Sequence, residues 1–74
     1  MNMLIEKETG RILEIEENFI ETKKHYGLNN TYYMKNQVEL VENIDLPDFV
    51  KKRIYTYKND EFIEIPVQEV TDEQ

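Results

Sequence analysis

The chain has 74 residues, no cysteine, and 16 acidic against 9 basic residues, which gives a formal net charge of −7. A chain of this length forms one domain with a thin core, and without cysteine it has neither a disulfide framework nor a sulfur-bound zinc site to support that core. The excess of acid repels nucleic-acid phosphates, so we expect no direct nucleic-acid partner.

Near the start of the chain, two apolar runs flank the polar turn Lys7–Gly10. A glycine at the fourth turn position takes the left-handed conformation that closes a type I turn with a bulge, so the pattern predicts a β-hairpin over residues 4–15. The expected register sets Ile5 opposite Leu13 on an apolar face. Leu4 points to the other face, where it would pack against a second element.

Residues 17–26 change the pattern, because apolar and polar positions now recur at the spacing of one helical face. Glu17 and Glu21 lie early and Lys23 and Lys24 lie late in this segment, which suits the helix dipole. Gly27 offers a left-handed stop. The segment therefore predicts a short helix.

The middle of the chain is rich in strand formers between Thr31 and Val41. A hairpin turning at Lys35–Asn36 and a single bent strand are both compatible with this stretch, and both stay open. Pro47 then suits the first position of a helix, where its missing N–H costs nothing, so we expect a helical turn near residues 47–52.

A second hairpin is predicted late in the chain, with its turn at Asn59–Asp60, two residues that tolerate positive φ. Pairing around this turn sets Tyr57 against Phe62 on one face and Ile54 against Ile65 on the other. The hairpin is therefore expected to be apolar on both faces.

Taken together, the pattern predicts an α+β fold: a small antiparallel sheet of two to three β-hairpins, a short helix at about residues 17–26 and a helical turn near residues 47–52. One domain is expected over residues 1–67. Pro66 ends the last ladder, and residues 68–74 carry three acids and one valine, so they are expected to form a disordered acidic tail.

The residue types of this chain give little support for a catalytic site. Serine is absent, His25 is the only histidine, and the two glycines form no phosphate-binding loop. His25 is expected to be a solvated residue at the end of the helix. We therefore expect no enzyme, no catalytic residue, no metal or other cofactor, and no small-molecule substrate.

Surface residues carry the functional hypotheses instead. Tyrosine offers a large apolar area with a hydroxyl and is enriched at protein interfaces. The candidate interface residues are Tyr32, Tyr33, Tyr55 and Tyr57. Tyr32 and Tyr33 are the better pair, because neighbouring strand residues point to opposite faces and one of them must look outward. The candidate acidic surface consists of Glu14, Glu16, Glu17, Glu39, Glu42, Glu61 and Glu64.

The segments Glu6–Ile15, Leu46–Asp48 and Tyr55–Pro66 resemble short proteins encoded among the tail and baseplate genes of phages and prophages of low-GC Gram-positive bacteria. The resemblance covers about half of the chain and implies an accessory or structural protein that binds other proteins, including copies of itself through hairpin edges. The alternative is a small acidic inhibitor from a mobile element, a DNA-mimic decoy for a host nucleic-acid-binding protein.

The expected location follows from the apolar pattern. The N-terminus reaches an acid at Glu6, too early for a signal peptide, and no apolar run approaches the length that spans a bilayer. We expect a cytoplasmic protein without a membrane partner, associated with virions if it is phage-encoded.

Overall fold

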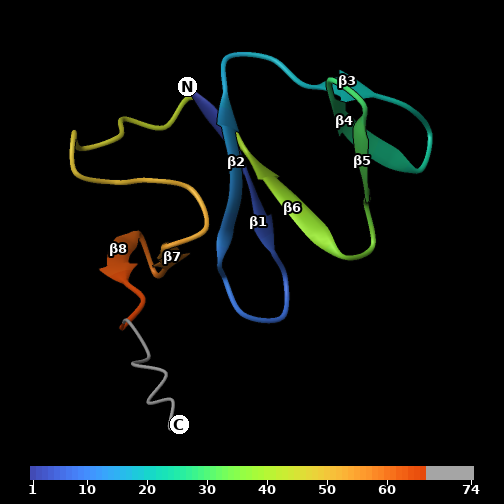
Figure 1. Cartoon of the computed structure of the whole chain (residues 1–74). Helices are drawn as coiled ribbons and strands as arrows, with labels where there is room; N and C mark the ends of the chain where they lie inside the picture. Colours follow the sequence, from blue (N-terminus) through green and yellow to red (C-terminus); the bar gives the residue numbers. More distant parts are fainter. Residues whose placement is uncertain (67–74) are drawn as a thin grey trace, which may run out of the picture.

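Three small antiparallel sheets make up the described part of the protein, residues 1–66 of a computed structural model (Figure 1). The strands are β1 (Asn2–Glu6), β2 (Ile12–Glu16), β3 (Ile20–Glu21), β4 (His25–Leu28), β5 (Thr31–Met34), β6 (Val38–Val41), β7 (Tyr55–Lys58) and β8 (Glu61–Glu64). No helix occurs among these residues, so the predicted α+β class is wrong and the fold is all-β. The tail predicted at residues 68–74 lies outside the described part.

The central sheet has the strand order β2-β1-β6. Its β1–β2 pair confirms the first predicted hairpin, and Gly10 has the expected positive φ, 80°. The register differs at one point: Ile5 pairs with Ile12, because a bulge shifts the ladder between Leu4 and Ile5. The bulge leaves Leu13 without the partner that we expected.

Opposite faces of this sheet pack against different parts of the chain. Met3, Ile5 and Ile12 join Val50 and Tyr55 in one buried cluster, which the β7–β8 hairpin and the segment before it cover. Leu4 points to the opposite face, as side chains alternate along a strand, and is also fully buried. The thin central sheet is therefore covered on both sides.

The predicted helix at residues 17–26 is replaced by two strands and the turn between them. β3 and β4 pair antiparallel, and the hairpin closes where the Thr22 N–H donates to the His25 carbonyl (2.9 Å) and the His25 N–H donates to the Thr22 hydroxyl (3.0 Å). An isolated helix of ten residues is marginal in water, whereas β4 gains a full ladder with β5. Tertiary pairing thus overrides the helical spacing.

Neither alternative for the middle of the chain is correct. β5 pairs with β4 and β6 pairs with β1, so the two strands belong to different sheets. The turn between them, in which the Gln37 N–H donates to the Met34 carbonyl (2.9 Å), carries the chain from one sheet to the next. β6 thereby buries Val38 in the central sheet.

The second predicted hairpin is confirmed by β7 and β8. Tyr57 pairs with Phe62, and both turn residues have positive φ, 52° at Asn59 and 63° at Asp60. Residues 47–52 form single turns in place of the expected helical turn. The Val50 N–H donates to the Pro47 carbonyl (3.1 Å), but no ladder of helical hydrogen bonds continues from this turn.

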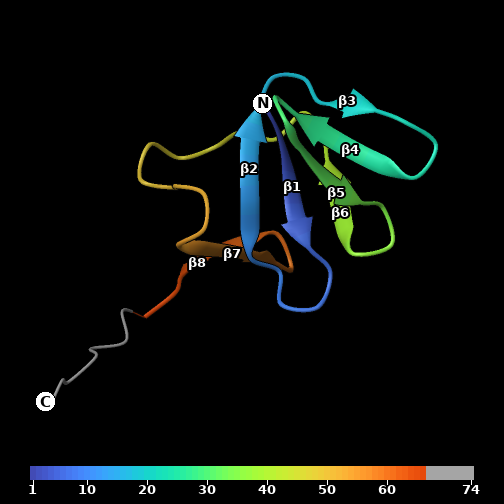
Figure 2. The ribbon, with the colours of Figure 1, turned by 45° about the vertical axis from the view of Figure 1, so that its right-hand side comes forward.

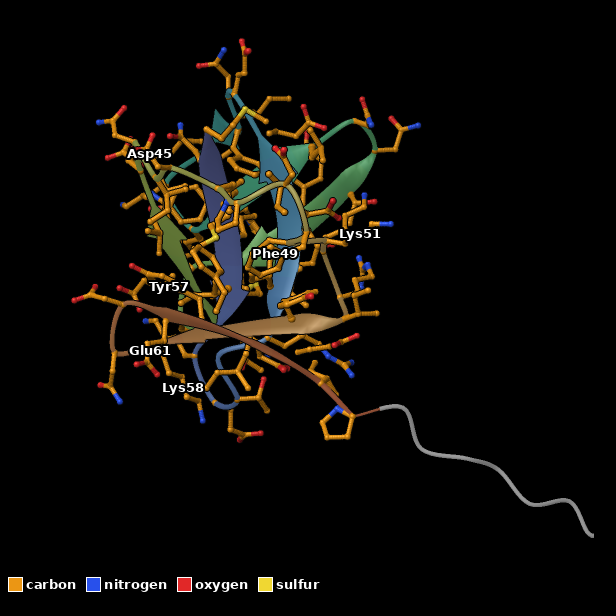
Figure 3. All side chains as sticks on the ribbon, turned by 90° about the vertical axis from the view of Figure 1, so that its left-hand side faces the viewer. Asp45, Phe49, Lys51, Tyr57, Lys58 and Glu61 are labelled. Carbon is orange, nitrogen blue, oxygen red and sulfur yellow. The ribbon has the colours of Figure 1, made fainter. Side chains whose placement is uncertain are left out.

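The two smaller sheets flank the central sheet. In Figures 1 and 2 the β3-β4-β5 sheet and the β7–β8 hairpin lie on different sides of the central sheet. Figure 3 shows the β7–β8 ribbon crossing one end of the central sheet, with Lys58 and Glu61 at the turn of the hairpin. Two small sheets therefore flank a central one, each with an outer face.

Candidate interaction surfaces

The four candidate interface tyrosines have different environments. Tyr55 is buried in the core, and Tyr57 is half-buried, with its ring 4.8 Å from that of Phe62. Tyr33 is half-buried and its hydroxyl is engaged inside the molecule, whereas Tyr32 is 53% exposed. Of the four, Tyr32 is the residue that the structure presents most fully to solvent.

Tyr32 belongs to an exposed apolar surface on the outer side of the β3-β4-β5 sheet. The register aligns Ile20, Gly27 and Tyr32 across the three strands, and His25 with Met34 in the next row of the same face. Ile20 is 51% and Met34 is 39% exposed. We call this set (Ile20, His25, Tyr32 and Met34) the β5 face.

The Tyr32 ring packs directly over Gly27, which has no side chain. A Cβ atom at Gly27 would lie 2.5 Å from Cε1 of Tyr32, far closer than two carbons approach, so the ring occupies the space that any larger residue would fill. The edge of the His25 ring meets the Tyr32 ring at a centroid distance of 6.2 Å. Tyr32 thus covers a glycine of the neighbouring strand, an aromatic cross-strand contact of the kind that stabilises sheets.

One end of the β5 face is basic. Lys23 and Lys24 form the β3–β4 turn, and together with Met34, Lys35 and Asn36 they line a shallow groove of about 310 Å³. The ammonium group of Lys35 is occupied by Glu21 at 2.6 Å. Neither Lys23 nor Lys24 forms an ion pair with another of residues 1–66.

Glu14, one of the candidate surface acids, is buried instead. Its side chain is 7% exposed, and its carboxylate accepts a hydrogen bond of 2.6 Å from the Tyr33 hydroxyl. Lys52 Nζ lies 3.1 Å from Oε1, and an Arg53 guanidinium nitrogen lies 3.3 Å from Oε2 and 2.9 Å from the Tyr33 hydroxyl. This polar cluster joins the central sheet, β5 and the segment that leads into β7.

The cluster perturbs the titration of both of its hydrogen-bonded acids. Burial by itself raises the pKa of Glu14, but the hydrogen bond from Tyr33 and the charges of Lys52 and Arg53 outweigh it and hold the pKa below its ordinary value of 4.5. Burial and the adjacent carboxylate raise the pKa of Tyr33. Glu14 is therefore ionised, its carboxylate is paired within the molecule, and we infer that it has a structural role.

The segment before β7 places Arg53 so that both its backbone and its side chain contact β2. Arg53 has a φ of 73°, a left-handed conformation that non-glycine residues seldom adopt. Its N–H donates to the Ile12 carbonyl at the edge of β2, while its guanidinium reaches Glu14. The sequence offered no sign of this arrangement, because the partners are far apart in the chain.

The other six candidate acids are exposed but do not form one surface. Glu16 ends β2, Glu17 follows it and Glu42 follows β6, and these two strand ends lie at the same end of the central sheet. Glu39 is on β6, and Glu61 and Glu64 are on β8. The acidic residues are thus divided among at least three places.

The β7–β8 hairpin has a second exposed apolar surface on its outer side. Tyr57 and Phe62 face the core, so the alternate residues face outward, and of these Ile54 is 46% and Ile63 is 50% exposed. The Ile65 N–H donates to the Ile54 carbonyl (2.8 Å), which places these two residues side by side, as the sequence predicted. We call Ile54, Ile63 and Ile65 the β8 face.

A cleft of about 370 Å³ lies between the turns of the two confirmed hairpins. Charged residues of both signs line it, among them Glu6, Lys7, Glu39 and Lys58. No group of three or more potential ligand side chains able to hold a metal ion occurs within residues 1–66. Across the same residues, the structure contains no helix long and apolar enough to cross a membrane.

Sequence reasoning had placed Tyr32 on a candidate interface but had missed Ile20 and Met34. The predicted helix assigned Ile20 to another element, and only the pairing of β3 with β4 brings it beside Tyr32. Comparison of the chain with protein-family models, curated proteins and solved structures finds no match. The surfaces described above are therefore the basis for a functional proposal.

Proposed function

We propose that this protein is a non-enzymatic protein-binding module that uses the β5 face as its contact surface, in an accessory or structural role of the phage or prophage type. The observation that carries the proposal is the group of Ile20, Tyr32 and Met34 on the β5 face, three large apolar side chains that are each at least 39% exposed on one small sheet. Exposed apolar residues gathered on one face mark interaction surfaces.

Two further features support a binding role for this face. Tyr32 already packs over Gly27, so less conformational freedom would be lost when a partner covers the ring than for a side chain without such a contact. Lys23 and Lys24 border the β5 face and offer charges at its rim, where charges favour the correct partner over others. An apolar centre with a polar rim is the usual layout of a protein interface.

Tyr33, Tyr55 and Tyr57 take no part in the proposed contact. Their rings or hydroxyls are used within the molecule, by Glu14, the core and Phe62. The decoy alternative would have to work without Glu14, whose carboxylate already has two cationic partners. We therefore prefer the apolar contact to the acidic one.

Site-specific cross-linking in the native host tests the proposal. A photoreactive phenylalanine analogue replaces Tyr32, and a matched variant carries the same analogue in place of Phe49, which is 60% exposed but lies away from the β5 face. We expect position 32 to give a discrete cross-linked protein, whether a second copy or another chain, and position 49 to give none. Equal, diffuse products at both positions, or no product at position 32, would contradict the proposal.

A further inference from the structure

The groove at one end of the β5 face carries uncompensated positive charge. Three lysines line it together with one residue of the face: Lys23, Lys24, Lys35 and Met34. Within residues 1–66, the acid that pairs with this set is Glu21, and it contacts only Lys35, at 2.6 Å. Two ammonium groups therefore lie beside an exposed apolar surface without an ion pair in the described part of the chain.

This positive charge lies at one end of the face only. Lys23 and Lys24 form the turn between β3 and β4. At the opposite end, the turn between β4 and β5 consists of the uncharged Asn29 and Asn30, and the segment that leads into β3 includes an acid, Glu17. A molecule that covers the β5 face therefore meets apolar side chains along its middle and lysines at one end.

The distance between the apolar and the basic part can be worked out from the strand. Lys35, the lysine of the groove that follows β5, comes three residues after Tyr32. At about 3.3 Å per residue of extended chain, this separation is roughly 10 Å. A bound segment that is itself extended covers the same distance in about three residues.

We propose that the occupant of the β5 face is an acidic segment of a partner protein. An apolar side chain of this segment packs against Ile20 and Tyr32. Its carboxylates, about three residues away along the segment, pair with Lys23 and Lys24. This inference rests on the proposed function and states the chemistry of the partner, since complementary charge at the edge of an apolar contact selects one partner over others.

Nucleic acid also carries negative charge but suits this surface less well. The formal charge of −7 repels a polyanion from the rest of the molecule. Two free lysines neutralise few phosphates, so the counterion release that supports nucleic-acid binding is small. Ile20 and Met34 offer no donor to a phosphate or a base edge. An acidic protein segment, in contrast, uses both the lysines and the apolar side chains.

The composition of the segment that cross-links to position 32 tests the inference. The photoreactive Tyr32 variant is irradiated in the host, the product is digested with protease, and the linked peptide is sequenced by mass spectrometry. We expect at least two aspartates or glutamates within about four residues of the linked position. A linked peptide that is neutral or basic over this range, or a product that nuclease removes, would overturn the inference.

Charge reversal tests the role of the lysines. In the photoreactive variant, Lys23→Glu combined with Lys24→Glu should lower the cross-linking yield by about fivefold or more. Replacing the acids of the linked segment by lysine in the partner should restore most of the yield in this background. Lys51→Glu is the matched control, because Lys51 is an exposed lysine away from the β5 face (Figure 3), and it should leave the yield unchanged. Circular dichroism checks that each variant keeps the wild-type fold.

The outcomes separate this inference from the proposed function. Equal yields with the reversed lysines and with Lys51→Glu, or a lysine-bearing partner that fails to restore the yield, contradict the inference. If position 32 links to a discrete protein through a segment without acids, the proposed function stands and this inference fails. If position 32 gives no discrete product, both fail.

Discussion

Replacing Glu14 by glutamine tests whether the buried polar cluster holds the three sheets together. The substitution keeps the shape of the side chain and an acceptor for Tyr33 but removes the charge that faces Lys52 and Arg53. We expect the fold to survive and the free energy of unfolding to fall. The neighbouring exposed acid of the same strand, Glu16, provides the matched control as Glu16→Gln.

The magnitude follows from the exposure of the partners. Lys52 and Arg53 are each 53% exposed, so each ion pair contributes about 0.2–1 kcal/mol, well below the value for a fully buried pair. The 2.6 Å hydrogen bond from Tyr33 is charge-assisted, and loss of its ionic part costs about a further 1 kcal/mol. Glu14→Gln should therefore destabilise the protein by about 1.4–3 kcal/mol, which lowers the Tm by roughly 6–24 °C in a domain of this size.

Urea unfolding followed by far-ultraviolet circular dichroism measures this change, since the chain has no tryptophan to report on the core. A double-mutant cycle with Tyr33→Phe should show coupling of at least about 0.5 kcal/mol between the two residues. Glu14→Gln that is as stable as Glu16→Gln, or a cycle without coupling, would refute the structural role of the cluster.

Three further predictions concern pH and the two glycines. Because folding lowers the pKa of Glu14, the contribution of its carboxylate to stability is complete above the ordinary pKa of 4.5 and is lost as the pH falls through the lower folded value. The difference in unfolding free energy between wild type and Glu14→Gln, measured by urea titration, should therefore shrink below pH 4.5. A difference that stays constant would contradict this. Gly27→Ala should displace the Tyr32 ring and cost about 1 kcal/mol, but should be harmless in a Tyr32→Ala background, as thermal unfolding of the four proteins would show. Gly10→Ala should lower the free energy of unfolding by about 1–2 kcal/mol in the same assay, because φ is 80° and the new Cβ would lie 2.9 Å from Lys58 carbon atoms. A smaller loss than for Gly27→Ala would count against the reasoning.

The sequence predicted both hairpins that depend on local chemistry. Gly10 and the Asn59–Asp60 turn determine chain reversal within a few residues, and the structure confirms both turns. The outward position of Ile54 and Ile65 followed from the same local register. Where a turn and its flanking strands are neighbours in the chain, pattern alone was sufficient.

The errors lie where the partner is distant in sequence. Residues 17–26 have a helical spacing, yet β4 gains its ladder from β5, and Gly27 leaves room for the Tyr32 ring instead of ending a helix. Glu14 was assigned to solvent because Lys52 and Arg53 are 38 and 39 residues away. Periodicity carries no information about such contacts, so the composition of the β5 face could not be derived from the sequence.

Oxidative footprinting tests most directly whether the β5 face is a contact surface. Hydroxyl radicals modify exposed tyrosine, methionine and phenylalanine side chains, and Tyr32 and Met34 can be compared with Phe49, which is exposed and outside the face. In dilute purified protein all three should react. In host cells, we predict that Tyr32 and Met34 become protected while Phe49 reacts as before; equal reactivity of all three in both conditions would contradict the account.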